Sequence, residues 1–218
     1  ACWRMYKICY NEKVIKLAHM DLEAHLPQTD KEHLIVHYPG KVKYIHNYLD
    51  NIEKNTKLKY LYILSPDVEQ LKKDFFSQFK IVEAAGGLVL NKEGKVLFIF
   101  RRGHWDLPKG KMELDETKKQ SAKREVMEET GLAKVQIIKK LITTYHIYRG
   151  QSSNRRILKP TYWYLMHAKG SKVTPQLEED IELCEWKKLN AKALTQLVPI
   201  YHNIKDVMKA YLHLVQEG

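Results

Sequence analysis

Three glutamates near the middle of the chain have a spacing that suits metal chemistry. Glu125, Glu128 and Glu129 stand at positions i, i+3 and i+4 of a segment with helical periodicity, so they would share one helix face. Neighbouring carboxylates repel one another, and a hard divalent cation such as Mg²⁺ or Mn²⁺ removes that repulsion. Because Mg²⁺ also binds substrate phosphates, the spacing indicates chemistry on a phosphate compound. The alternative is a solvated helix face with ordinary ion pairs.

The flanking residues complete a longer pattern. Residues 110–132 fit G-x5-E-x7-R-E-U-x-E-E-x-G-U, where U is aliphatic, at every defined position. Seven positions require one residue type, so a chance match has a probability of about 10⁻⁸ per window. Glu116 can add a metal ligand or accept a proton from metal-bound water, and the fork of Arg124 can hold a carboxylate. Gly110 permits close approach of phosphate, and Gly131 ends the helix.

This segment resembles the signature box of the Nudix hydrolase family, and the resemblance extends over about residues 81–218. Members of that family are α/β/α sandwiches around a mixed sheet. They hydrolyse a nucleoside diphosphate linked to another moiety, assisted by Mg²⁺ or Mn²⁺. The resemblance implies that the metal ligands are Glu125, Glu128 and Glu129. It implies that catalysis depends on Glu116, Glu128, the orienting Arg124 and a carboxylate of the acidic loop before Trp186, for which we choose Glu179.

The loop before the box narrows the expected substrate. Many family members have Gly-Gly where this chain has Lys109-Gly110. The sequence Trp-Asp-Leu-Pro-Lys-Gly of residues 105–110 resembles the dinucleoside-polyphosphate hydrolases and the bacterial RNA 5′-pyrophosphohydrolases. We therefore expect a phosphate-rich small molecule as substrate, with a dinucleoside polyphosphate favoured and an RNA 5′ end less favoured. The residues expected to contact substrate are Arg101, Lys109, Gly110 and Lys111.

A second basic segment lies further along the chain. The loop predicted at 150–159 is bracketed by Arg149, Arg155, Arg156 and Lys159. It could close over a polyphosphate, or it could be a plain basic hairpin tip, and the sequence does not choose between these alternatives.

The chain divides into two parts at about residue 80. Residues 1–80 predict a small α/β unit of unknown role, with a hairpin over 5–18, a helix over 43–55, a strand over 59–64 and a second helix over about 67–79. A core of this size is marginal alone, so we expect the unit to pack on the second part of the chain. Residues 81–218 predict the Nudix domain, with the box helix over 116–130, a final helix over 199–215, and strands over 82–90, 95–101, 135–142, 145–149, 161–167 and 185–189.

Composition sets the outer limits. The 218 residues carry a net charge of +11, which favours anionic partners without choosing among them. Three cysteines, Cys2, Cys9 and Cys184, are too few for a disulfide framework, so a cytoplasmic location is expected. The sequence contains no run of 18 or more apolar residues, so no membrane-spanning helix is expected. A homodimer is compatible with the sequence. Two other functions compete with the enzyme: a nucleotide-sensing or regulatory Nudix domain without catalysis, and a basic RNA-binding domain.

Overall fold

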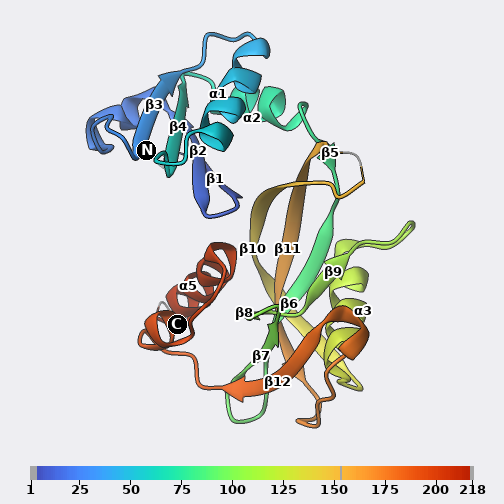
Figure 1. The fold of residues 1–218 in the computed structure, drawn as a ribbon. Helices are drawn as coiled ribbons and strands as arrows, with labels where there is room; N and C mark the ends of the chain where they lie inside the picture. Colours follow the sequence, from blue (N-terminus) through green and yellow to red (C-terminus); the bar gives the residue numbers. More distant parts are fainter. Residues whose placement is uncertain (1–3, 153, 217–218) are drawn as a thin grey trace. The chain divides into compact units, whose positions relative to one another are not determined.

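The computed structural model describes residues 4–152 and 154–216, and Cys2 therefore lies outside the described part (Figure 1). The chain forms two compact units. Unit 1 comprises residues 1–81 and 145–159, and unit 2 comprises residues 82–144 and 160–218. The first boundary lies close to the expected division at residue 80. The segment 145–159 had been expected in the second part, but it belongs to unit 1 because its side chains join the core of that unit.

Unit 1 is a mixed sheet with helices. Its elements before residue 82 are β1 (Met5–Tyr10), β2 (Lys13–His19), the 3-10 helix η1 (Met20–His25), β3 (His33–His37), α1 (Lys43–Lys54), β4 (Tyr60–Ser65), α2 (Val68–Phe76) and β5 (Lys80–Ile81). Strand β1 pairs antiparallel with β2, and β2 and β3 both pair parallel with β4. The end of β10 (Val135–Arg149) pairs parallel with β1, with Ile8 opposite Tyr145. The start of β11 (Arg156–Ala168) pairs parallel with β5.

The core of unit 1 explains this arrangement. Helix α1 buries Ile45, Leu49 and Ile52 at the predicted three-to-four spacing, and α2 buries its own apolar face. Fully buried Ile147 and Leu158, from the inserted segment, belong to the same cluster. The apolar faces of α1 and α2 therefore share their core with Ile147 and Leu158, two residues from the part of the chain after residue 80.

Unit 2 is an α/β/α sandwich around a mixed sheet, as expected. Its remaining elements are β6 (Ala84–Leu90), β7 (Val96–Arg101), β8 (His104–Asp106), β9 (Lys109–Lys111), α3 (Lys118–Thr130), the 3-10 helix η2 (Leu177–Glu179), β12 (Ile181–Lys187), α4 (Ala193–Gln196) and α5 (His202–Gln216). The strand order is β12-β7-β6-β11-β10. Strand β6 pairs parallel with β11 and antiparallel with β7 (Figure 1).

Alternation along the strands of unit 2 builds two cores, one on each face of the sheet. On β6, Ala85 and Val89 pack with α3, whereas Leu88 and Leu90 pack with the α5 side. On β11, Tyr164 and Met166 join the α3 side, and Trp163 and Leu165 join the α5 side. This two-sided burial explains why β6 is buried along its whole length. The α3 side is the one that carries the predicted metal-binding glutamates.

Several boundaries differ from those expected, including that of the last strand, predicted over 185–189 and observed as β12 (Ile181–Lys187). The predicted strands 135–142 and 145–149 are one continuous strand, β10, and the loop 150–159 is shorter because β11 begins at Arg156. Helix α3 begins at Lys118 because Thr117 caps it: Thr117 and Gln120 form a reciprocal capping box. Glu116 therefore precedes the helix.

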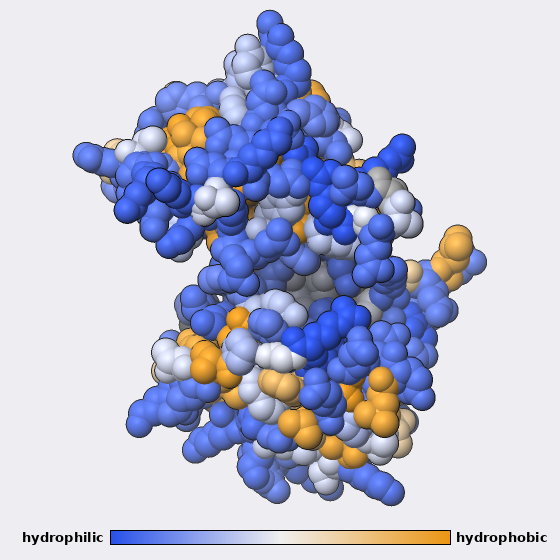
Figure 2. Space-filling view, in the orientation of Figure 1, coloured by the Kyte–Doolittle hydropathy of each residue, from blue (hydrophilic) through white to orange (hydrophobic). Residues whose placement is uncertain are grey.

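The face drawn in Figure 2 is mainly hydrophilic with scattered apolar groups. No helix within the described residues is long and apolar enough to cross a membrane.

Candidate active site

Helix α3 presents the glutamates because its opposite side is buried. Ala122 and Val126 are fully buried against β6 and β7 in the core of unit 2. This packing fixes the rotation of the helix about its axis. It therefore directs the side chains of Glu125 and Glu128 towards the loop that contains β9. Gly131 ends the helix in the left-handed conformation, with φ of 69°, and donates from its N–H to the carbonyl of Met127.

Arg124 is the centre of the site. It donates from Nε to Oε1 of Glu116 (2.6 Å) and from Nη2 to Oε2 of the same carboxylate (2.9 Å). Its Nη1 donates to Glu125 (2.9 Å) and to Glu128 (3.0 Å), and Nη2 also donates to the carbonyl of Lys111 (3.0 Å). One guanidinium thus holds three carboxylates and the end of β9.

Arg124 determines the protonation state of Glu116. Hydrogen bonds from Arg124 lower the pKa of Glu116 to about 2, and the backbone N–H of Glu113 adds a further bond (3.1 Å). Glu116 is therefore ionised at neutral pH. The same contacts raise the pKa of Arg124, whose guanidinium stays charged.

Glu125 lies in a more enclosed place than its neighbour Glu128. Burial raises the pKa of Glu125, and the negative charges of Glu128 and Glu179 raise it further, while Arg124 opposes them. A Cβ on Gly110 would collide with the Glu125 carboxylate, so this glycine is what allows β9 to pass against the acid. The side chain of Glu128 is half exposed, with 50% of its surface accessible.

Glu129 has a different environment from the other two helix glutamates. Its side chain is only 3% exposed, Oε2 accepts from the backbone N–H of Lys109 (2.9 Å), and Oε1 accepts from Nη1 of Arg101 (3.3 Å). Burial raises its pKa to about 7, although the positive charges of Lys109 and Arg101 act in the opposite direction. Glu129 therefore ties the loop before β9 to α3, a contact that its spacing alone does not reveal.

A buried carboxylate that the sequence reasoning missed completes this network. Asp106 is 1% exposed and accepts from Nε of Arg101 (3.3 Å) and from Nζ of Lys109 (2.6 Å). The ammonium of Lys109 is itself largely enclosed, with 12% of the side chain exposed. Arg101 and Lys109 thus each have a buried carboxylate partner, and their contact with substrate phosphate stays a prediction. The sequence indicates the burial of Asp106 only through its two apolar neighbours, Trp105 and Leu107.

The remaining predicted residues lie at the rim. Lys111 is exposed at the end of β9. Glu179 is exposed in η2, and its charge acts on Glu125. The loop before η2 is tied to the end of α3 because the N–H of Gln176 donates to the carbonyl of Glu129 (3.3 Å). Arg102 pairs with Asp180 (2.9 Å), and both side chains are exposed.

An aromatic pair lies beside the same network. The rings of His104 and Tyr201 stack with centroids 4.5 Å apart and planes 13° from parallel. His104 lies in β8 and Tyr201 precedes α5. The two rings come from positions almost a hundred residues apart in the sequence, so no local pattern indicates their contact.

The described residues contain no ready-made group of three metal-binding side chains. Glu125 and Glu128 instead share one nitrogen of Arg124, and Glu129 is satisfied by Arg101 and Lys109. The basic segment around 150–159 belongs to unit 1, whereas the carboxylates around Arg124 belong to unit 2.

Residues 80–210 match the NUDIX domain. The chain is 36% identical over 114 residues to the putative mutator protein MutT4 of Mycobacterium tuberculosis (strain CDC 1551 / Oshkosh), covering 47% of this chain and 43% of that protein. It therefore spans less than half the length of this relative. It is 26% identical over 152 residues to the RNA pyrophosphohydrolase of Pelagibacter ubique (strain HTCC1062), covering 59% of this chain and 91% of that protein.

Two solved structures are also similar. The MutT protein from Methanosarcina mazei Go1 gives a TM-score of 0.49 at 18% identity, covering 65% of this chain and 99% of that one. A C. elegans Ap4A hydrolase gives 0.48 at 20% identity, covering 63% and 99%. The match to the NUDIX domain covers more than half of the 218 residues, and it includes the whole cluster around Arg124, so the chain belongs to the NUDIX domain family.

Proposed function

We propose that the chain is a divalent-metal-dependent pyrophosphohydrolase that cleaves a phosphoanhydride bond in nucleoside polyphosphates. The observation that carries the proposal is the grouping of Glu116, Glu125 and Glu128 around Arg124, within reach of the charge of Glu179. Four carboxylates and a single arginine leave an excess of negative charge beside an exposed rim. A phosphate substrate would be repelled from this group unless a cation accompanied it.

The donor set fits Mg²⁺ or Mn²⁺. Every candidate donor is a carboxylate oxygen, which hard cations prefer, and the raised pKa of Glu125 reflects burial and like charge that a cation would relieve. Glu125 and Glu128 would hold the metal, with Glu129 as a further ligand and Glu116 as a ligand or proton acceptor. Bound there, a divalent cation would lower the pKa of a water and neutralise phosphate oxygens.

The chain's own residues would do the positioning. Arg124 holds Glu116 and Glu125 in fixed orientations, and Glu129 and Asp106 hold the loop that ends in Gly110. Gly110 and Lys111 are then the parts of β9 that would face substrate phosphate. The stacked rings of His104 and Tyr201 offer a flat surface for a nucleobase, which any base could use.

The favoured substrate is a dinucleoside polyphosphate. The sequence of residues 105–110 supports this choice, and base stacking without a base-specific contact supports tolerance of the base. We expect adenine and guanine dinucleoside tetraphosphates to be cleaved with kcat/KM values within about tenfold of each other, or about 1.4 kcal/mol. Both should exceed ADP-ribose, which offers two phosphates to the cations of the site.

The test is cleavage in Mg²⁺ and in Mn²⁺, followed by chromatographic separation of the nucleotide products, over a panel that also contains nucleoside triphosphates, diphosphoinositol polyphosphates and 5′-triphosphate RNA. Divalent-dependent cleavage of any member distinguishes the enzyme from a nucleotide-sensing Nudix domain, which would bind without turnover. A preference for ADP-ribose or for 5′-triphosphate RNA would refute the substrate assignment while leaving the reaction class intact. The match to an RNA pyrophosphohydrolase over 91% of its length is the reason for including RNA.

Glu179 and Glu178 allow a matched pair of substitutions in the acidic loop before Trp186. We propose that Glu179 assists catalysis, because its charge reaches Glu125. Glu179→Gln should lower kcat by about 100-fold, the lower range for loss of a proton-transfer group. Glu178→Gln, which removes a similar exposed charge one residue earlier, should change kcat less than threefold. Equal effects of the two substitutions on kcat would argue for a general field of the loop instead.

A further inference from the structure

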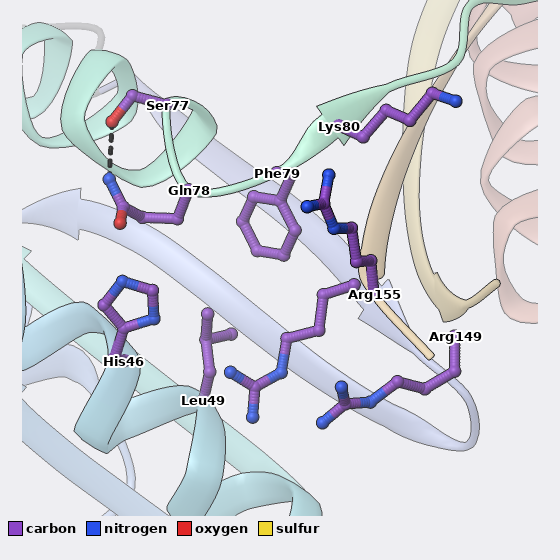
Figure 3. A pocket seen from close by; sticks show the side chains of 9 residues that line it. His46, Leu49, Ser77, Gln78, Phe79, Lys80, Arg149 and Arg155 are labelled. Carbon is purple, nitrogen blue, oxygen red and sulfur yellow. Dashed lines mark hydrogen bonds between the residues drawn. The ribbon is translucent and has the colours of Figure 1, made fainter. Parts of the chain in front are cut away.

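Unit 1 contains a basic pocket that the proposed reaction does not use. The pocket has a volume of about 500 Å³ and is formed only by residues of unit 1. Figure 3 shows the side chains that line it, contributed by α1, by the segment after α2 and by the hairpin that joins β10 to β11. They are His46, Leu49, Ser77, Gln78, Phe79, Lys80, Arg149, Arg155 and Arg156.

The charge of the pocket is positive. Four of its lining residues are lysine or arginine, a fifth is His46, and none of the described lining residues is acidic. Two carboxylates lie behind the wall: Glu53 accepts from Arg149 (2.7 Å) and from Arg156, and Asp50 also pairs with Arg156. The lining itself is therefore basic, and a basic lining attracts an anion.

Ion pairs fix two of the arginines that line the pocket. Nη2 of Arg156 is held by Asp50 and Glu53, and Nε of Arg149 is held by Glu53. Both guanidinium groups are therefore kept in place before any ligand arrives.

The size and the apolar part of the wall indicate more than an inorganic ion. A volume of about 500 Å³ lies in the range of small-molecule sites, roughly 300–1,000 Å³. Leu49 is fully buried and Phe79 is 9% exposed, and together they form an apolar side to the pocket. Arginine forks match phosphate oxygens.

We propose that this pocket binds the phosphate group of a small phosphorylated organic molecule, with the organic part against Phe79 and Leu49. Unit 1 would then be a ligand-binding unit carried by the same chain as the hydrolase, which is a role that its small size and mixed sheet do not themselves suggest. The site is separate from the carboxylate cluster of unit 2, so its occupancy does not depend on the proposed reaction.

The test uses the full chain with AMP as the probe and adenosine as its phosphate-free match. Isothermal titration is carried out in EDTA, which removes divalent-dependent binding at the carboxylate cluster. We expect saturable binding of one AMP and no binding of adenosine. Arg155→Ala combined with Lys80→Ala should weaken AMP by at least about tenfold, because charge-assisted hydrogen bonds to phosphate are lost. Both residues are exposed, so the fold should be retained.

Lys57→Ala is the matched control, because Lys57 is an exposed lysine of unit 1 that does not line the pocket. It should leave AMP affinity unchanged, and thermal melts of both variants should match that of the parent chain. Absence of AMP binding, equal binding of adenosine, or unchanged affinity in the double variant would overturn the proposal. Binding of single-stranded RNA much more tightly than AMP, with the same loss in the double variant, would overturn it in favour of a nucleic-acid surface.

Discussion

Glu128→Gln is expected to abolish most turnover while leaving the protein folded. The substitution keeps the shape of the side chain and removes the charge that the proposed metal needs. Loss of a supporting group around a metal costs up to about 100-fold, so loss of a ligand should cost at least that factor in kcat. Glu128 is half exposed and its only described side-chain partner is Arg124, so little folding energy depends on it.

Glu128→Gln should lower turnover without lowering the stability of the fold. The charge of Glu128 is one of the causes that raise the pKa of Glu125, so its removal relieves repulsion in the folded state. The melting temperature in EDTA should therefore stay the same or rise slightly. Glu182→Gln, at an exposed position on β12, serves as the control and should change neither quantity. Parental turnover in Glu128→Gln would show that Glu128 is not a metal ligand.

Removal of residues 5–79 is expected to make the rest of the chain aggregate. The truncation deletes most of unit 1 but leaves the inserted segment 145–159, whose buried Ile147 and Leu158 lose their neighbours. Exposing each of these side chains costs about 1.5–3 kcal/mol. The unpaired end of β10, which pairs with β1 in the intact chain, would also be open to other chains. Soluble yield and the melting temperature measure the outcome.

A variant with a shortened hairpin between β10 and β11 is the control for this truncation. In a fragment of residues 82–218, replacing 145–159 by Asn-Gly would join Thr144 to Pro160 through a two-residue turn. This variant should be soluble and should melt at a higher temperature than the simple truncation. If the two fragments behave alike, the inserted segment is not what makes unit 1 necessary.

The local part of the site could be predicted because its geometry follows from one helix. The spacing of Glu125 and Glu128, with Arg124 beside them, is set by α3, and the structure places all three together. The long-range part could not be predicted. Asp106 and Arg101 meet Glu129 only because β7 and the loop before β9 fold against α3, and no local periodicity encodes that contact.

The fold shows the same division between local and long-range information. Short continuous apolar runs predicted β6 and β7, and the helical spacing of apolar residues predicted α1 and α2. Strand β3 was missed because its short apolar run is flanked by His33 and His37, and it lies at the end of the strand order. The pairing of β1 with β10 joins positions as distant as Ile8 and Tyr145, and its register depends on tertiary packing alone.

The discontinuous composition of unit 1 has a consequence for biosynthesis. The first 81 residues leave the ribosome without the strand that pairs with β1 and without Ile147 and Leu158, so their core stays incomplete until residue 159 has been made. At roughly 5–20 residues per second, this wait lasts several seconds. During it, the nascent N-terminal segment presents an unpaired β1 edge and part of an open apolar core, which are features that chaperones bind. Most of unit 1 is thus synthesised before residues 82–144, and yet its core cannot be completed until those residues and the segment 145–159 have been made.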